Sequence, residues 1–325
     1  MPIFRRSDPA ALVASLAPVP TDWNAIRITA VMPAYNEAAH IEQAIRLVKA
    51  VPLTIELVCV DDASRDGTGA ILKRLKTEGL VDTLIHHEVN RGKGSALRSG
   101  IAVATGHVIV VQDADLEYDP TEFAELLEPI RTGKADAVFG SRFQSGPRRV
   151  LYFWHSVGNR FLTLLSNMLT DLNLTDMETC YKMVRADLLK QLPLTSSRFG
   201  FEPEVTARLS SAGARIWEVP ITYSGRTYAE GKKINWKDGV AALWHIVRFN
   251  VAPPRVPPTS LRIFVALGVA QLVATPSAHA YLDPVTGSVI LQVLVAGLLG
   301  FLLTIKRVWY VLTEPFRRLW RWLRG

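Results

Sequence analysis

The chain has 325 residues, of which 49% are hydrophobic, and a formal net charge of +7. Its two cysteines, Cys59 and Cys180, lie far apart without metal-ligand spacing, which argues against a disulfide scaffold or a zinc finger. The excess positive charge is concentrated after Lys306, so no nucleic-acid-binding surface is expected. This length allows one large core and a second, smaller module.

Residues 1–25 form a proline-broken leader, and residues 26–250 alternate between strand-like and helix-like runs. The strand-like runs are short, rich in β-branched residues and end in turn or acidic residues; they are residues 26–33, 54–62, 107–113 and 135–141. Ile41, Ile45 and Val48 mark one face of an intervening helix. This order predicts an α/β domain with a mostly parallel sheet and helices on both faces.

The stretch "VQDADLEYD", residues 111–119, places four carboxylates directly after an apolar run. Like charges this close destabilise a fold unless a cation lies among them. Because residues i and i+2 of an extended chain face the same way, Asp113 and Asp115 are expected to point to one place. Mg²⁺ often binds one or two carboxylates together with substrate phosphates, so the pattern predicts a divalent cation and a diphosphate. Taken alone, the pair could equally belong to a surface turn.

Further polar motifs follow other strand-like runs. In "VDDASRDGT", Asp61 and Asp62 are suited to accept hydrogen bonds from a base amide and a ribose hydroxyl. In "NRGKGSALRSG", Lys93 lies between glycines at a helix start, where backbone N–H groups favour anions. Ligands of parallel sheets bind beyond the carboxyl ends of the strands. The motifs therefore predict a nucleotide site at that edge.

In this order, "VMPAYNEAAHI", "VDDASRDGT", "NRGKGSALRSGI", "QDADLEYDP" and "GSRF" resemble glycosyltransferase family 2, whose catalytic domain has the Rossmann-like GT-A fold. The resemblance covers roughly Arg27 to Asn250. The stretches "TDMETCYKMVR", "FGFEPEV" and "YSGRTYAEGKKINWKDG" are most similar to the polyprenyl-phosphate sugar transferases, the dolichyl-phosphate mannose synthase branch.

The resemblance implies roles for individual residues. Those expected to bind the nucleotide sugar are Pro33, Tyr35, Glu37, Asp62, Lys93, Asp113, Ala114 and Asp115. The catalytic set implied is Asp113, Asp115, Arg142, Arg226 and Lys232. Its three cations would neutralise the donor diphosphate and the lipid phosphate. Asp115 would ligate Mg²⁺ or Mn²⁺; Glu117 stands where relatives often have Gln or Ser, which leaves the second ligand open.

Two groups of residues allow alternative interpretations. Four further acids could position the sugar or act as a base, or the last two could simply begin a helix; they are Asp176, Glu178, Glu202 and Glu204. The stretch 150–169 is either a core helix or a membrane-surface helix, and residues 236–250 form a second amphipathic piece expected to lie along the bilayer.

Three segments complete the chain: a proline-rich linker at 251–260, two transmembrane helices within 261–305 and a basic amphipathic tail at 306–325. Val285–Ile305 has no charged residue and is long enough to span a bilayer at ~1.5 Å per residue. Leu261–Thr275 is shorter, and an interfacial helix or cleavage after Ala280 are its alternatives. Lys and Arg flank the pair but are absent from the loop between, which predicts a hairpin with both ends in the cytoplasm.

The resemblance, together with these patterns, implies an inverting, metal-dependent transfer of a hexose from GDP-mannose or UDP-glucose to a polyprenyl phosphate. The reaction is expected at the inner membrane, on a multi-pass protein whose catalytic domain is cytoplasmic. One alternative is a glycosyltransferase with a hydroxyl acceptor, as in polysaccharide or glycolipid synthesis. The other is a catalytically silent, membrane-anchored partner protein. A homo-oligomer is left open.

Overall fold

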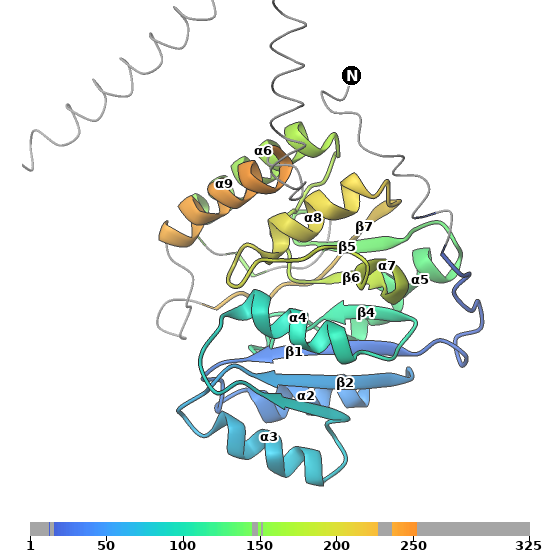
Figure 1. Cartoon of the computed structure of the whole chain (residues 1–325), viewed down its shortest axis with the longest axis vertical. Helices are drawn as coiled ribbons and strands as arrows, with labels where there is room; N and C mark the ends of the chain where they lie inside the picture. The colour runs from blue at the N-terminus through green and yellow to red at the C-terminus, as the bar shows by residue number, and fades with distance from the viewer. Residues whose placement is uncertain (1–12, 14–15, 145–148, 151, 227–235, 252–325) are drawn as a thin grey trace, which may run out of the picture. The chain divides into compact units, whose positions relative to one another are not determined.

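The computed structural model describes residues 13, 16–144, 149–150, 152–226 and 236–251, all within one compact unit. Its strands form a seven-stranded sheet in the order β3-β2-β1-β4-β6-β5-β7 (Figure 1). The strands are β1 (Ile28–Ala34), β2 (Ile55–Asp61), β3 (Thr83–His86), β4 (Val108–Val111), β5 (Ala137–Ser141), β6 (Lys182–Arg185) and β7 (Ile216–Pro220). Only β6 runs antiparallel to its neighbours, so the predicted mostly parallel sheet is confirmed.

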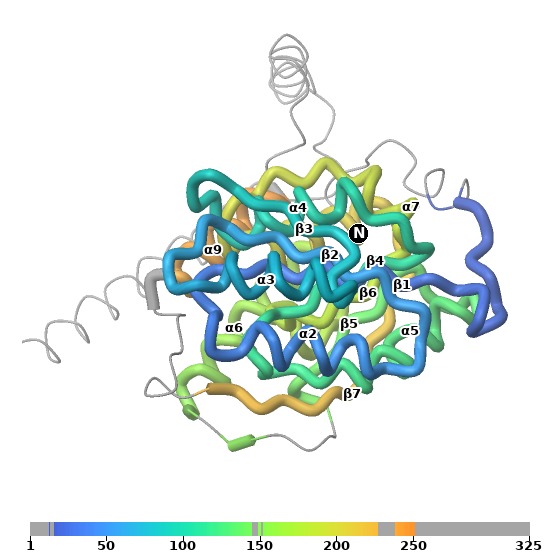
Figure 2. The backbone as a smooth tube through the Cα atoms, turned by 90° about the horizontal axis from the view of Figure 1, so that it is seen from below, coloured from blue at the N-terminus to red at the C-terminus, as the bar shows by residue number. Residues whose placement is uncertain are grey.

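Helices cover both faces of the sheet. They are α2 (Ile41–Ala50), α3 (Thr68–Thr77), α4 (Lys93–Val103), α5 (Phe123–Arg131) after the 3-10 turn η1 (Pro120–Glu122), α6 (Phe153–Thr170), α7 (Ala186–Leu189), α8 (Phe201–Ser211) and α9 (Trp236–Val251). Val58 and Val60 of β2 pack with Ala96 of α4, whereas Leu57 and Cys59 belong to the larger core on the other face. Figure 2 shows α4 and α2 on opposite sides of the strands. Successive residues of β2 thus face opposite sides of the sheet, as the two-residue period of a strand requires.

The register of the parallel strands brings three loops to one edge of the sheet. Ala34 at the end of β1 lies opposite Asp61 of β2, and Val31 lies opposite Val111 at the end of β4. The chain therefore leaves β1, β2 and β4 side by side. The motifs that follow these strands meet there, as the sequence predicts.

Several predicted features lie outside the described residues. These include most of the leader, Lys232, and the linker, transmembrane hairpin and tail after residue 251. Among the helices that the structure does describe, none is both long and apolar enough to cross a bilayer. The two amphipathic pieces expected at 150–169 and 236–250 are confirmed as helices, α6 and α9.

Candidate active site

Three carboxylates gather after β4 because the backbone turns sharply there. Leu116 has a φ of 63°, a left-handed conformation that is uncommon for a residue with a β-carbon. The turn brings the Glu117 amide within 3.2 Å of Asp115 Oδ1, to which it donates. Asp113, Asp115 and Glu117 thus come close together. Backbone strain of this kind is characteristic of ligand sites.

Arg226, which follows β7, meets this group from the other side. Its Nη2 donates to Asp115 Oδ2 at 2.9 Å, and its backbone N–H donates to Glu117 Oε1 at 2.8 Å. Its Nη1 lies 3.5 Å from Glu37 Oε2, on the loop after β1. The Tyr223 hydroxyl donates to Glu117 Oε2 at 2.7 Å. One guanidinium therefore partly neutralises carboxylates from two separate loops.

The cluster nevertheless keeps an excess of negative charge. Burial, together with the nearby charges of Asp113 and Glu117, raises the pKa of Asp115 to about 7, although Arg226 opposes the shift. Hard oxygen ligands with uncompensated charge suit Mg²⁺ or Mn²⁺. Within the described part of the chain, no three side chains already form a complete ligand set. A divalent cation here would need oxygens from a ligand as well.

Lys93 joins two parts of the site. Its Nζ lies 3.0 Å from Asp113 Oδ1 and 3.1 Å from Glu202 Oε1, at the start of α8. The α4 N-terminus was expected to bind an anion, but the Gly94 and Ser95 amides donate to the carbonyls of Arg198 and Ser197. A β-carbon on Gly94 would lie 2.6 Å from the Ser196 carbonyl, so the glycine permits close packing. Nucleotide binding by Lys93 stays a prediction.

The side chain of Asp62, directly after β2, is held in place by hydrogen bonds with neighbouring loops. Its carboxylate accepts from the Arg91 amide at 2.9 Å and from the Gly92 amide at 2.7 Å. The His87 ring nitrogen Nδ1 lies 2.7 Å from the same carboxylate. Asp62 therefore joins β2 to the start of α4, and its pairing with His87 is not predictable from the sequence.

The other residues predicted to bind the nucleotide lie at the same edge. Tyr35 is exposed, Pro33 is half-buried at the end of β1, and Ala114 is buried between the two aspartates. The described residues of the predicted set are thus gathered in space, although their contacts with a ligand stay predictions.

Arg142 forms a buried ion pair that the sequence did not suggest. Its Nε and Nη2 donate to the two carboxylate oxygens of Asp176 at 2.6 and 2.8 Å, and its backbone amide adds a third hydrogen bond at 3.1 Å. The guanidinium also lies over the Tyr223 ring, 5.1 Å from its centroid. Arg142 is therefore held beside the segment that carries Arg226, and its contact with a phosphate stays a prediction.

The other three of the four further acids, Glu178, Glu202 and Glu204, have different surroundings. Glu204 is fully buried and accepts from the amides of Thr195 and Ser196, at 2.9 and 2.7 Å, so it holds a loop. Burial and the charge of Glu202 raise the pKa of Glu178 to about 8. Glu202 and Glu204 lie in the first turn of α8, which confirms that "FEPE" begins a helix.

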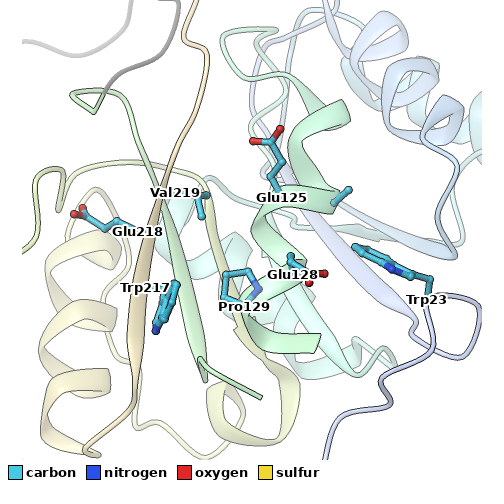
Figure 3. Close-up of a pocket in the computed structure, with 8 residues that line it drawn as sticks. Trp23, Glu125, Glu128, Pro129, Trp217, Glu218 and Val219 are labelled. Carbon is cyan, nitrogen blue, oxygen red and sulfur yellow. The ribbon is translucent and has the colours of Figure 1, made fainter. Parts of the chain in front are cut away.

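A separate groove lies between α5, β7 and Trp23, with a volume of ≈ 470 Å³ (Figure 3). Its eight lining residues include three glutamates and no basic residue; they are Trp23, Ala124, Glu125, Glu128, Pro129, Trp217, Glu218 and Val219. A nucleoside diphosphate needs positive partners, so this groove does not suit the donor.

An α/β fold with a charged site at the carboxyl edge of its parallel strands is typical of nucleotide-binding enzymes. The family model for glycosyl transferase family 2 matches residues 29–193. The chain is 33% identical over 238 residues to an undecaprenyl-phosphate mannosyltransferase of Micrococcus luteus, an alignment covering 70% of this chain and 95% of that one. The chain therefore belongs to glycosyl transferase family 2, and it is a glycosyltransferase.

Other relatives act on related lipids according to their names. A polyprenol monophosphomannose synthase of Mycolicibacterium smegmatis is 28% identical, over 63% of this chain and 80% of its own. A dodecaprenyl-phosphate galacturonate synthase of Rhizobium johnstonii is 26% identical, over 64% of this chain and 62% of its own.

A solved structure shows the same fold. Glucosyl-3-phosphoglycerate synthase from Mycobacterium tuberculosis, in complex with Mn²⁺, uridine diphosphate and glucosyl-3-phosphoglycerate, superposes with a TM-score of 0.55. It is 20% identical, and the match covers 77% of this chain and 88% of that one. The expected GT-A type of fold is thus confirmed.

Proposed function

We propose that this glycosyltransferase transfers a hexose from a nucleoside diphosphate sugar to a polyprenyl phosphate. The observation that carries the proposal is the group of three carboxylates faced by Arg226 at the carboxyl edge of the sheet. Such a site can hold a cation-bound diphosphate and supply a guanidinium for a phosphate oxygen. The names of the three relatives, each a polyprenyl-phosphate sugar transferase or synthase, support the acceptor.

Asp115 and Glu117 are the residues that would hold Mg²⁺ or Mn²⁺ in this proposal. The bound cation would stabilise the negative charge of the departing nucleoside diphosphate. The complex of the solved relative with Mn²⁺ and uridine diphosphate supports a divalent cation. GDP-mannose and UDP-glucose are both retained as donors, because no described residue discriminates between them.

Arg226 acts as an internal counter-ion of the carboxylates. It lies on the carboxylates that the cation would bind, so its guanidinium must leave Asp115 when the donor complex enters. The released guanidinium then has a new partner, because the donor and acceptor phosphates are anionic. Binding of the donor and rearrangement of Arg226 are therefore coupled. Lys232, six residues further along the chain, is proposed as a second cation of the same clamp.

The surroundings of Glu202 and Glu204 do not suit either of them to serve as the base that a hydroxyl acceptor would need. A hydroxyl needs a general base within hydrogen-bond reach, whereas a phosphate monoester is already anionic near neutral pH. Glu204 is fully engaged with the loop at Thr195, and Glu202 is paired with Lys93. Neither carboxylate is placed as an unpaired base.

The test is transfer of labelled sugar from a panel of nucleotide sugars, with Mn²⁺, into a product that organic solvent extracts and mild acid cleaves. We expect a labelled lipid with wild-type protein, and none with Asp115→Asn. The control is Glu78→Gln, which removes an exposed carboxylate at the C-terminal end of α3 and should retain full transfer. Label in a water-soluble polymer, or in no product, would reject the proposed acceptor.

Residues 261–305 are proposed to cross the membrane as a hairpin. A reporter fused after Gly325 should then be cytoplasmic, and one inserted near Asp283 should be on the opposite side. Finding Gly325 on the outer side, or a mature fragment that begins at Tyr281, would contradict the hairpin.

A further inference from the structure

The segment before β6, residues 176–181, lies beside the carboxylates that follow β4. Because β6 runs antiparallel to β4, with Met183 opposite Val110, its first residues lie at the edge where the parallel strands end. The Cys180 amide donates to the Tyr118 hydroxyl at 3.0 Å, which joins this segment to the loop after β4. In the sheet, β6 lies on the side of β4 away from β1 (Figure 1). A donor with its nucleoside beyond β1 and its diphosphate beyond β4 would therefore extend its sugar toward residues 176–181.

Lys93 is shared between two carboxylates at this place. Its Nζ lies 3.0 Å from Asp113 Oδ1 and 3.1 Å from Glu202 Oε1. The Glu202 side chain is 8% exposed, so the pair lies largely out of solvent, where charges interact more strongly than in water. An anionic group on a ligand would have to compete with Glu202 for this ammonium group.

A second lysine, Lys182, is bound by the backbone before β6. It is the first residue of β6 and is 2% exposed. Its Nζ donates to the carbonyls of Met177 and Thr179, at 2.8 and 2.5 Å. Burial lowers the pKa of Lys182 to about 8, although the charges of Glu202 and Glu178 oppose the shift. The ammonium group of Lys182 therefore holds the protein's own turn.

Two polar atoms of the same turn lack partners. Glu178 Oε1 and Thr179 Oγ1 are both buried, and neither has a hydrogen-bond partner among the described residues. Burial and the charge of Glu202 raise the pKa of Glu178 to about 8, so its carboxyl group keeps a proton near neutral pH. A protonated carboxyl group both donates and accepts hydrogen bonds, as does a hydroxyl group. Buried polar atoms without partners are rare in folded proteins, and here they fit a ligand rich in hydroxyl groups.

We propose that the donor's sugar binds beside Glu178 and Thr179, and that Glu202 makes this place reject a sugar that carries a carboxylate. A uronate would bring a further negative charge to a place where Glu202 already holds the ammonium group of Lys93. Like charges brought together out of solvent are strongly unfavourable, which is a common means of excluding a wrong ligand. The distinction matters among the relatives, because one is named a dodecaprenyl-phosphate galacturonate synthase. This inference rests on the proposed function, which supplies the nucleotide sugar.

The experiment compares two pairs of donors that differ only at C6 of the sugar: UDP-glucose with UDP-glucuronate, and GDP-mannose with GDP-mannuronate. Calorimetry of the full chain in detergent, with Mn²⁺, gives the Kd of each donor without any acceptor. In the pair that binds, the hexose should bind about 10²-fold more tightly than its uronate. Glu202→Gln releases Lys93 from one of its two carboxylates, so this ratio should fall by about tenfold, through tighter binding of the uronate. The matched control, Glu125→Gln at an exposed position of α5, should leave the ratio unchanged.

Equal affinity of the wild-type protein for a hexose donor and its uronate would overturn the inference, and this comparison needs no variant. An unchanged ratio in Glu202→Gln, with an unfolding midpoint that shows a folded protein, would overturn it as well. So would an equal loss of affinity for both donors, because that result would give Glu202 a purely structural role. Selective binding without sugar transfer to a polyprenyl phosphate would reject the proposed function alone. Absence of binding by all four donors would reject both.

Discussion

Loss of the Asp176 charge should destabilise the protein strongly, because Arg142 would be left in a buried position without its counter-ion. The Asp176 side chain has 0% exposure and that of Arg142 has 14%. Three hydrogen bonds join the two residues. Breaking a buried pair by removing one partner generally costs about 3–5 kcal/mol. Asparagine keeps one acceptor oxygen, so about 3 kcal/mol is expected for Asp176→Asn.

Thermal unfolding of the full chain in detergent provides the measurement. For a domain of this size, 1 kcal/mol corresponds to about 2–4 °C, so the midpoint should fall by about 6–12 °C. The control is Glu128→Gln, which breaks a pair with Arg131 of similar length, 2.8 Å against 2.6 Å, in which Glu128 is half exposed. Exposed pairs contribute about 0–1 kcal/mol, which limits that shift to about 4 °C. Equal shifts in the two variants would refute the reasoning.

The double variant Arg142→Met, Asp176→Leu extends the test. Replacement of a buried pair by apolar residues of similar size is often neutral, so most of the lost stability should return. We expect no sugar transfer from this double variant, because the predicted contact of Arg142 with phosphate is removed. Full activity in this stable variant would reject that contact.

Three further predictions concern charges. Arg226→Met should lower turnover by about 10²-fold or more. In the absence of donor it should strengthen Mn²⁺ binding by about tenfold, if the guanidinium's competition with the cation for the carboxylates costs about 1.4 kcal/mol. Unchanged Mn²⁺ affinity in calorimetry would contradict the counter-ion role. Asp115→Asn should abolish transfer without lowering the unfolding midpoint. The substitution removes a charge that is buried beside the like charges of Asp113 and Glu117, so it relieves repulsion. A large fall in the midpoint would refute this. Burial opposes ionisation of Asp136, but hydrogen bonds from Arg215 outweigh it and lower the pKa. That stabilisation is complete above the unfolded-state pKa of about 3.9 and is lost as pH falls below it. The difference in free energy of unfolding between wild type and Asp136→Asn should therefore narrow from pH 6 to pH 3. If urea unfolding gives the same difference at both pH values, the ionised Asp136 makes no such contribution.

The sequence alone determined those strands and helices that depend on patterns among neighbouring residues. Each of the four strand-like runs contains an observed strand, and Ile41, Ile45 and Val48 are buried on one face of α2. The ordered motifs at the strand ends identified the family, because each motif is a local arrangement of turn residues and acids. Their convergence was predictable as well, since the carboxyl ends of neighbouring parallel strands share one edge.

The strands missed from the sequence show the limit of local pattern. β3 and β6 have four residues each and include polar residues (TLIH and KMVR), unlike the equally short β4, whose residues are all β-branched (VIVV). β7 alternates weakly at the edge of the sheet. The antiparallel placement of β6 between β4 and β5 depends on contacts between segments that are far apart in the sequence. No run of adjacent residues specifies it.

Only the tertiary structure decided which charges meet. Arg226 and Asp115 are 111 positions apart, and Lys93 reaches Asp113 and Glu202 from a different helix. Likewise, the "VLYFWHSVGNRF" stretch predicts a helix, but which face of it is buried depends on the hydrogen bonds that Thr163 and Asn167 make with residues 174–177. Helical period and turn chemistry are encoded by near neighbours, whereas ion pairing and burial depend on which distant segments the fold places in contact.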